Sequence, residues 1–370
     1  MRILFITFGL NNKNGWDHYS LKTVQAIKKL GHEVKIIAPK KSEIDPEFLS
    51  CTSKISYCAI GTGNLPGWWT NRFLKFHKLI KWADIVHVTV EPLTVLTAFL
   101  TPKKKPLIFT GVGTYSIEPF RSKWAKGIFK RAWKRPARIL AISDYTKQKI
   151  VQFHGERPIN VIPLGVSLTE AMKNAKPAWT NSPQILGVGE VKRRKDFVNV
   201  IEALALLKEK IPGAKLVIAG STSSKPEMER AKQAIEKHGL QESVDFRGFV
   251  SDDELKQLYQ ESQLFVMTSV SSEYHFEGFG LVYLEANGYG LPSIGSIESG
   301  ASSAIKDNYS GKLVPTGKPE ALSTAMHEIL GKEESWKQYS RDARKFAEAM
   351  NWNTYAEKVE AVYLELLKKK

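Results

Sequence analysis

The stretch Arg2-Ile3-Leu4-Phe5-Ile6-Thr7-Phe8 is a nearly continuous apolar run of the length expected for a buried β-strand. A loop rich in glycine and asparagine follows at 11–16, and residues 20–30 have helical spacing that ends at Gly31. Residues 33–38 form a second strand-like run. A strand, a helix and a strand in this order predict the β-α-β unit from which parallel sheets are built.

Strand and helix patterns keep alternating along the rest of the chain. Apolar strand-like runs recur at 85–90, 107–110, 138–142, 160–163, 184–188, 215–219, 244–246, 264–268, 292–295 and 311–315. Residues 167–183 separate the run at 160–163 from the run at 184–188, and they contain two prolines, two asparagines and no clear period. We therefore predict an α/β protein with two Rossmann-like domains. The expected boundaries are an N-terminal domain at 1–166, a linker at 167–183, a second domain at 184–345 and a C-terminal helix at 346–370 that packs back on the first domain.

Composition limits the class of protein. The chain has 370 residues, 42% of them apolar, and no run approaches the roughly 20 apolar residues of a membrane span. Its first residues lack the small-residue cleavage site of a signal peptide. Cys51 and Cys58 match no common metal-binding spacing, and we interpret them as two free thiols, with a disulfide as the alternative. We expect a cytoplasmic protein.

The positive charge is confined to the first half. The net charge is +16, with +17 on residues 1–165 and −1 on residues 166–370. It is densest at 121–138, where several apolar residues can share one helical face. These residues are Trp124, Ala125, Ile128, Phe129 and Ala132. Two readings stay open, a helix on an anionic membrane surface or a core-packed helix with a solvated basic face. Nucleic acid is a poorer partner, because no nucleic-acid-binding motif accompanies the charge.

One segment in the second half carries the pattern of a phosphate site. It begins with Glu277, continues with Gly278-Phe279-Gly280-Leu281 and reaches Glu285 eight residues after Glu277. Glycines let backbone N–H groups approach a ligand closely, and the start of the following helix favours an anion. The segment therefore predicts a diphosphate cradle, and a carboxylate about two turns into the helix suits the paired hydroxyls of a ribose.

Motifs along nearly the whole chain resemble those of the retaining family 4 glycosyltransferases. They include Gly187-Val188-Gly189, Lys192-Arg193-Arg194-Lys195-Asp196, Val244-Asp245-Phe246-Arg247-Gly248, Glu277-Gly278-Phe279-Gly280, Gly290-Leu291-Pro292 and Ser310-Gly311-Lys312. The resemblance implies the GT-B architecture, in which two Rossmann-like domains face a cleft. In that family the C-terminal domain holds a nucleotide sugar and the N-terminal domain holds the acceptor.

The resemblance also implies roles for individual residues. Glu277 is expected to be catalytic beside the transferred sugar, and Lys195 to be catalytic through its charge on the donor diphosphate. The remaining expected donor-binding residues are Gly15, Gly189, Arg194, Gly278, Phe279, Gly280, Leu281 and Glu285.

Three positions depart from the family pattern. Glu190 stands where an arginine is usual, so Lys192, Arg193 or Arg194 is expected to supply the missing charge. Trp16 occupies the first loop, where the family often has Gly-Gly, and Val112 replaces a histidine. The lone histidines His18 and His87 are more often structural than functional.

The resulting hypothesis is a retaining hexosyltransferase that needs no metal and no cofactor. GDP-mannose is the favoured donor, and UDP-glucose or UDP-N-acetylglucosamine is the alternative. We expect a glycan or a lipid-linked acceptor, and a possible contact with an anionic membrane surface through 121–138. The departures at Glu190, Trp16 and Val112 keep a second reading open, a nucleotide-sugar-binding protein with impaired catalysis.

Overall fold

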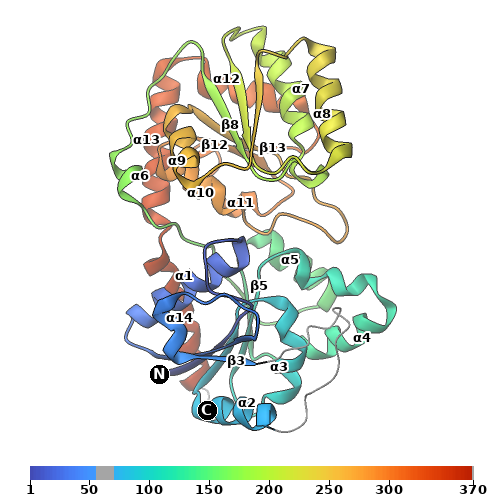
Figure 1. The fold of residues 1–370 in the computed structure, drawn as a ribbon, viewed down its shortest axis with the longest axis vertical. Helices are drawn as coiled ribbons and strands as arrows, with labels where there is room; N and C mark the ends of the chain where they lie inside the picture. The colour runs from blue at the N-terminus through green and yellow to red at the C-terminus, as the bar shows by residue number, and fades with distance from the viewer. Residues whose placement is uncertain (56–70, 369–370) are drawn as a thin grey trace. The chain divides into compact units, whose positions relative to one another are not determined.

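The computed structural model describes residues 1–55 and 71–368 of the chain (Figure 1). It divides into two compact units, one formed by Met1–Leu164 with Trp352–Lys370 and the other by Gly165–Asn351. Cys58 lies outside the described residues, so the expectation for the two cysteines stays a prediction.

The first unit is built on a seven-stranded sheet. Its strands are β1 (Arg2–Ile6), β2 (Glu33–Pro39), β3 (Thr52–Ile55), β4 (Ile85–Val88), β5 (Leu107–Gly111), β6 (Arg138–Ala141) and β7 (Ile159–Val161). They pair in parallel in the order β3-β2-β1-β4-β5-β6-β7. The helices between them are α1 (Gly15–Lys29), α2 (Asn71–Trp82), α3 (Thr94–Leu100), α4 (Lys123–Ala132) and α5 (Asp144–His154). The order places the carboxyl ends of β1 and β5 on either side of β4.

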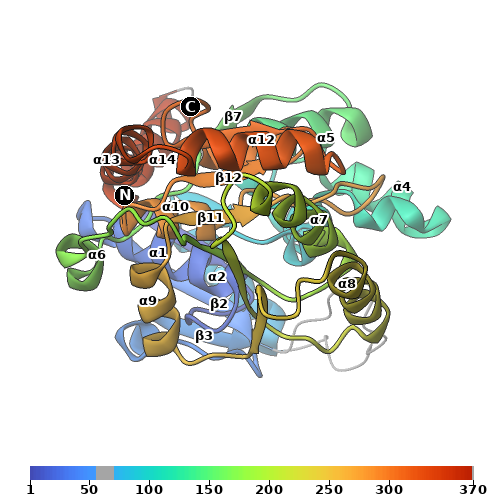
Figure 2. The same ribbon diagram turned by 90° about the horizontal axis from the view of Figure 1, so that it is seen from above.

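The second unit has a six-stranded sheet of the same kind. Its strands are β8 (Gln184–Val188), β9 (Lys215–Ala219), β10 (Val244–Gly248), β11 (Leu264–Met267), β12 (Ser293–Ser296) and β13 (Gly311–Val314). They pair in parallel in the order β10-β9-β8-β11-β12-β13. The helices are α6 (Glu170–Asn174), α7 (Phe197–Lys208), α8 (Lys225–His238), α9 (Asp252–Glu261), α10 (Leu281–Gly288), α11 (Ala301–Ala304), α12 (Pro319–Leu330) and α13 (Glu333–Ala349). Figure 2 shows α12 lying beside α7, where both contribute to the core of this unit. Two Rossmann-like α/β units are thus confirmed.

The C-terminal helix α14 (Trp352–Lys368) packs on the first unit, as the sequence predicted. Two of its tyrosines are bonded inside the core of that unit. The Tyr355 hydroxyl lies 3.0 Å from the Tyr19 hydroxyl, and the Tyr363 hydroxyl lies 2.6 Å from Nδ1 of His87. His87 is fully buried and bonds Thr110 through its other ring nitrogen, which makes its role structural.

The stretch 167–183 lies in the second unit and is more ordered than its composition suggested. It contains α6, and the Trp179 indole donates a hydrogen bond of 3.0 Å to the Leu330 carbonyl. The Arg344 guanidinium donates to the carbonyls of Met172 and Ala175, both at 2.9 Å. These bonds fix much of the stretch to the unit that follows it.

Helix α4 buries only part of the apolar face that the sequence suggested. Ala125, Phe129 and Ala132 are buried, whereas Trp124 and Ile128 are 65% and 40% exposed. The predicted single face is therefore wrong, because the apolar residues divide between the core and the surface. No helix of the described residues is both long and apolar enough to span a bilayer.

Candidate functional site

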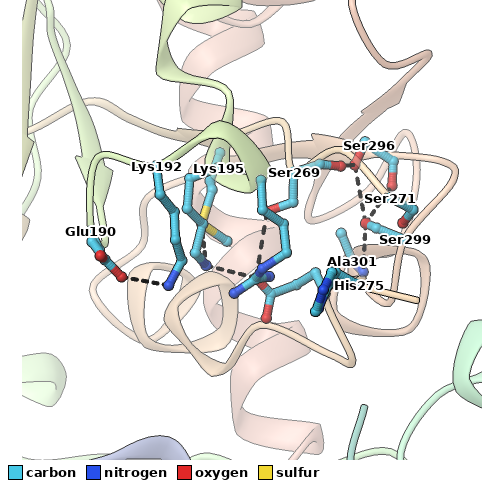
Figure 3. A network of polar contacts seen from close by, with 12 residues as sticks. Glu190, Lys192, Lys195, Ser269, Ser271, His275, Ser296, Ser299 and Ala301 are labelled. Carbon is cyan, nitrogen blue, oxygen red and sulfur yellow. Dashed lines mark hydrogen bonds and ion pairs between the residues drawn. The ribbon is translucent and has the colours of Figure 1, made fainter. Parts of the chain in front are cut away.

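A carboxylate held by two cations lies at the carboxyl edge of the second sheet. Oε2 of Glu277 accepts hydrogen bonds from Nζ of Lys195 at 2.6 Å and from Nη1 of Arg194 at 2.7 Å. The Ser269 hydroxyl, just beyond β11, donates to the same oxygen at 3.4 Å. Figure 3 shows Lys195 and Ser269 in this cluster, with Lys192 and Glu190 as a separate pair beside it. The two cations come from one segment of the chain and the carboxylate from another.

Local backbone geometry places Lys195. It ends a short 3₁₀ turn, Arg193–Lys195, and the next residue, Asp196, has a left-handed backbone with φ of 51°. Asp tolerates this conformation better than most residues. A Cβ on Gly189 would lie 3.3 Å from Cε of Lys195, and one on Gly220 would lie 2.1 Å from the Gly189 carbonyl oxygen. Gly220 is therefore required by its contact with the Gly189 backbone, and Gly189 has φ of 144°, a conformation that favours glycine.

Charge and burial together set the protonation of the cluster. Burial alone would raise the pKa of Glu277, but the Lys195 and Arg194 cations outweigh it and lower that pKa to about 2. Burial lowers the pKa of Lys195 from its ordinary value, and the Glu277 charge acts in the opposite sense. The Glu277 and Lys195 side chains are only 14% and 13% exposed, so their attraction is weakly screened. Glu277 is ionised at neutral pH and keeps both cations in place.

The turn after Glu277 leads into α10 through a close backbone contact. The Gly300 N–H donates to the Glu277 carbonyl at 2.8 Å, and a Cβ on Gly300 would lie 2.1 Å from the Gly278 carbonyl oxygen. Gly280, the residue before α10, has φ of 87°, a conformation that favours glycine. The Tyr283 N–H donates to the Gly280 carbonyl at 3.1 Å, whereas the first N–H groups of a helix generally find no acceptor inside it. Beside Lys195 and Arg194 they form a site suited to an anion.

Glu285 lies in the body of α10 and is half-buried. Its Oε2 accepts a hydrogen bond of 3.4 Å from the Tyr259 hydroxyl, and the Tyr259 ring stacks on Tyr289 at a centroid distance of 5.1 Å. Burial raises the pKa of Glu285 above its ordinary value. Tyr259 thus holds one oxygen of a carboxylate that is only partly buried.

The three candidates for the missing charge take different places. Lys192 forms an ion pair of 2.5 Å with Glu190, the residue found where an arginine was expected. Arg193 is exposed, whereas Arg194 is the one bound to Glu277. The structure thus brings Gly189, Arg194, Lys195, Glu277 and the turn from Gly278 to Leu281 into one site, with Glu285 in the helix that follows.

Gly15, the remaining predicted donor-binding residue, lies in the first unit at the start of α1. The Asn14 side chain accepts from the N–H groups of Trp16 and Asp17 at 3.1 and 3.0 Å, so this helix start is largely capped by the protein itself. The Val112 N–H donates to the buried carboxylate of Glu91 at 2.6 Å.

Two features of the site were missed from sequence. Gly300 has an ordinary φ of −64°, so only the close contact with Gly278 reveals why it is glycine. Ser269 is fully buried, and its carbonyl accepts from the Ser296 hydroxyl at 2.5 Å.

Among the described residues, no group of three or more His, Cys, Asp or Glu side chains has the arrangement of a metal site. The expectation that the reaction needs no metal or cofactor stays a prediction.

Family comparisons match both units. A model described as Glycosyltransferase Family 4 matches residues 14–170, and one described as Glycosyl transferases group 1 matches residues 169–346. Among curated relatives, a poly(glycerol-phosphate) alpha-glucosyltransferase from Bacillus subtilis is 29% identical over 50% of this chain and 27% of that protein. A GDP-mannose-dependent alpha-(1-6)-phosphatidylinositol monomannoside mannosyltransferase from Mycobacterium tuberculosis is 23% identical over 64% of this chain and 63% of that protein.

The chain spans about half or less of the first curated relatives that it matches, at 27%, 54% and 48% of their lengths. Among solved structures, the Anabaena protein HepE in complex with UDP is 17% identical, with a TM-score of 0.77 over 99% of this chain and all of that one. The chain has two Rossmann-like units, and each matches one of the two family models. It therefore has the GT-B fold of the group 1 and family 4 glycosyltransferases.

Proposed function

We propose that this protein is a retaining hexosyltransferase that moves a hexose from a nucleoside diphosphate sugar to an acceptor hydroxyl. The observation that carries the proposal is the contact of Glu277 with Lys195 and Arg194 beside the first turn of α10. Two partly buried cations and a helix start can neutralise a diphosphate, whose negative charge increases as the bond to the sugar breaks. Glu285 is placed to accept hydrogen bonds from ribose hydroxyls.

In the proposed reaction, the bond between the sugar's anomeric carbon and the diphosphate oxygen breaks. The bond from the anomeric carbon to the acceptor oxygen forms on the same face, which retains the configuration. The acceptor proton passes to the leaving diphosphate, so no protein nucleophile is needed. Lys195 and Arg194 stabilise the leaving group, and Glu277 keeps them ordered while the donor is absent.

GDP-mannose is our favoured donor, and a UDP sugar is the alternative. The similar proteins support both, since one relative is a GDP-mannose-dependent enzyme and one structural neighbour is in complex with UDP. Calorimetry with GDP, UDP and ADP separates the two, with the proposed donor's nucleotide binding at least tenfold more tightly than the others. If the protein binds none of the three nucleotides, this result would count against the proposed enzyme.

A nucleotide-sugar-binding protein without catalysis is the competing function. It is favoured by Glu190, which neutralises Lys192 at a position where the resemblance implies a cation. Release of free nucleoside diphosphate from the donor distinguishes the two, because an active site produces it slowly even without acceptor. Production should stop in Lys195→Met and continue in Lys192→Met.

We further propose that the acceptor is a glycan or a lipid-linked sugar at an anionic membrane surface, which α4 contacts. The exposed residues Trp124 and Ile128 lie among cations that form no ion pair within the described part of the chain. These cations are Lys123, Lys126, Lys130, Arg131 and Lys134. An interfacial tryptophan flanked by lysines suits anionic lipid headgroups. Sedimentation with phosphatidylglycerol vesicles, but not with phosphatidylcholine vesicles, is expected, and Trp124→Ser should reduce it.

A further inference from the structure

Three aromatic side chains cluster at the carboxyl edge of the first sheet. Phe8 lies two residues beyond β1, Trp16 lies in the first turn of α1, and Tyr115 lies in the 3₁₀ turn after β5. The Trp16 and Tyr115 rings meet edge to face, with centroids 4.4 Å apart and planes at 68°. Phe8 and Trp16 pack at 6.3 Å and 62°. We call these three residues the aromatic platform.

The platform is accessible and ordered. Phe8 and Tyr115 are 40% and 45% exposed, and Trp16 is half-buried. Edge-to-face contacts are the preferred arrangement of aromatic pairs, so each ring fixes the next. Large apolar side chains that are exposed together, rather than singly, mark a binding surface.

The loop and helix start beside the platform, residues 11–18, hold one lysine, and it is paired. The Asp17 carboxylate accepts from the amides of Asn11 at 2.8 Å and Asn14 at 3.0 Å. The one cation in this stretch, Lys13, forms an ion pair of 2.8 Å with Glu43. A helix N-terminus usually attracts an anion, but here Asn14 caps it and Asp17 adds a negative charge. The surroundings therefore suit an uncharged ligand.

Hydrogen-bonding groups without charge lie in the same segment, residues 11–18. Nδ1 of His18 lies 2.9 Å from Oδ1 of Asn12. Burial, with a smaller effect of the Lys22 charge, lowers the pKa of His18 to about 4, so this imidazole is neutral at pH 7. Amides and a neutral imidazole both donate and accept hydrogen bonds, as ligand hydroxyls require.

We propose that the aromatic platform binds the apolar face of an uncharged pyranose ring in the acceptor. A pyranose presents a face of C–H groups, which aromatic rings bind, and an edge of hydroxyls, which amide side chains bind. This inference rests on the proposed transfer to a glycan or lipid-linked sugar. It states which part of that acceptor, a pyranose ring, binds at the carboxyl edge of the first sheet.

Saturation-transfer NMR on the full chain tests the inference. The probes are the methyl α-pyranosides of mannose, glucose and galactose, with mannose 6-phosphate as the charged counterpart. We expect transfer to the ring protons of at least one glycoside, about tenfold weaker affinity in Trp16→Ala, and partial recovery in Trp16→Phe. Tyr115→Ala should weaken the affinity for the glycosides by a similar factor. Because Tyr115 lies in a different segment from Trp16, a folding defect in one variant would not explain both losses.

Phe99→Ala is the matched control, because Phe99 is an exposed aromatic residue of α3 in the same unit, outside the platform. It should bind the glycosides as the unaltered protein does. Equal signals in Trp16→Ala and the unaltered protein would overturn the inference, and so would the absence of signal from all three glycosides. Tighter binding of mannose 6-phosphate would show that the ligand is charged, which also contradicts it.

Nucleotide binding by calorimetry separates this inference from the proposed function. The platform variants should bind GDP or UDP within twofold of the unaltered protein. Loss of sugar binding with intact nucleotide binding supports the platform. Glycoside binding by a protein that binds no nucleotide would instead contradict the transferase while leaving the platform in place.

Discussion

Replacing Glu277 with glutamine should affect stability, nucleotide binding and turnover in different directions. The substitution keeps the shape of the side chain but removes the charge that Lys195 and Arg194 share at 2.6 and 2.7 Å. Both cations are then left partly buried without a counter-charge. Removing one partner of a buried ion pair commonly costs roughly 3–5 kcal/mol of folding free energy. We take this range as an upper limit, because the Arg194 side chain is 27% exposed.

The pKa of Glu277 gives a second measure of the same effect. Its fall from 4.5 to about 2 corresponds to about 3 kcal/mol in favour of the ionised form. Because the folded-state pKa is depressed, this stabilisation is complete above pH 4.5 and is lost as the pH falls toward 2. Glu277→Gln should therefore be about 3 kcal/mol less stable at pH 7, and the difference should shrink in acid. Urea denaturation at pH 7 and pH 3 measures both values.

A nucleoside diphosphate can replace the missing charge. Without the competing carboxylate, Glu277→Gln should bind GDP or UDP at least as tightly as the unaltered protein, and by up to about tenfold more tightly. Turnover of the nucleotide sugar should nevertheless fall by about 100-fold or more, because the substitution removes the carboxylate that the family resemblance implies beside the sugar. Calorimetry and a transfer or hydrolysis assay give the two values.

The matched control is Glu273→Gln, which changes an exposed carboxylate four residues earlier and should leave all three measurements unchanged. The reasoning is refuted if Glu277→Gln loses nucleotide binding in step with stability, because the cations would then not be the diphosphate site. Normal turnover in Glu277→Gln would refute the role of Glu277 itself.

Three further predictions concern packing and buried charge. Gly300→Ala should lose about 1–3 kcal/mol of stability in thermal denaturation, because its Cβ would lie 2.1 Å from the Gly278 carbonyl oxygen. The turn must shift to relieve this contact, so nucleotide binding should also weaken. Burial raises the pKa of Glu91 to about 7 from 4.5, so folded protein binds its proton more tightly and stability should fall as the pH rises between these values. Glu91→Gln should abolish that slope, which is worth about 3 kcal/mol in urea titrations. Tyr363→Phe should cost about 1–3 kcal/mol, because buried His87 loses its bond of 2.6 Å, and denaturant titration measures it.

Controls exist for these three variants. Gly127→Ala changes a glycine of α4 with nothing within 4 Å of the added Cβ, so it should be neutral or slightly stabilising. A loss equal to that of Gly300→Ala would contradict the packing argument. If the stability of Glu91→Gln still falls with rising pH, another group causes that slope. If Tyr363→Phe is as stable as the unaltered protein, His87 does not need its hydrogen bond to α14.

The sequence was sufficient where local pattern and tertiary structure agree. Apolar strands with helices between them predicted both sheets except for the edge strand β3, and the return of α14 to the first unit was also predicted. The Glu277 segment was found because glycines and two carboxylates at fixed spacing lie close together in the chain. These features depend on neighbours in sequence, which a single chain displays.

The missed features depend on neighbours in space. Choosing among Lys192, Arg193 and Arg194 required knowing that the turn directs only Arg194 and Lys195 toward Glu277. Helical periodicity grouped Trp124 with Phe129, but burial depends on what packs against α4, and that separates them. The need for glycine at 300 comes from a backbone contact with a turn some 20 residues away, which no local rule reveals.

The position of α14 has a consequence for how this protein folds during synthesis. The first sheet leaves the ribosome before any of the second unit, yet Tyr355 and Tyr363, which bond Tyr19 and His87 inside it, are made after all of the second unit. The earlier unit can therefore complete its core only when the later one has already been translated. The Tyr19 hydroxyl and Nδ1 of His87 lack their α14 partners in the meantime. A nascent chain stalled before Trp352 should therefore show native protease resistance in its second unit before its first.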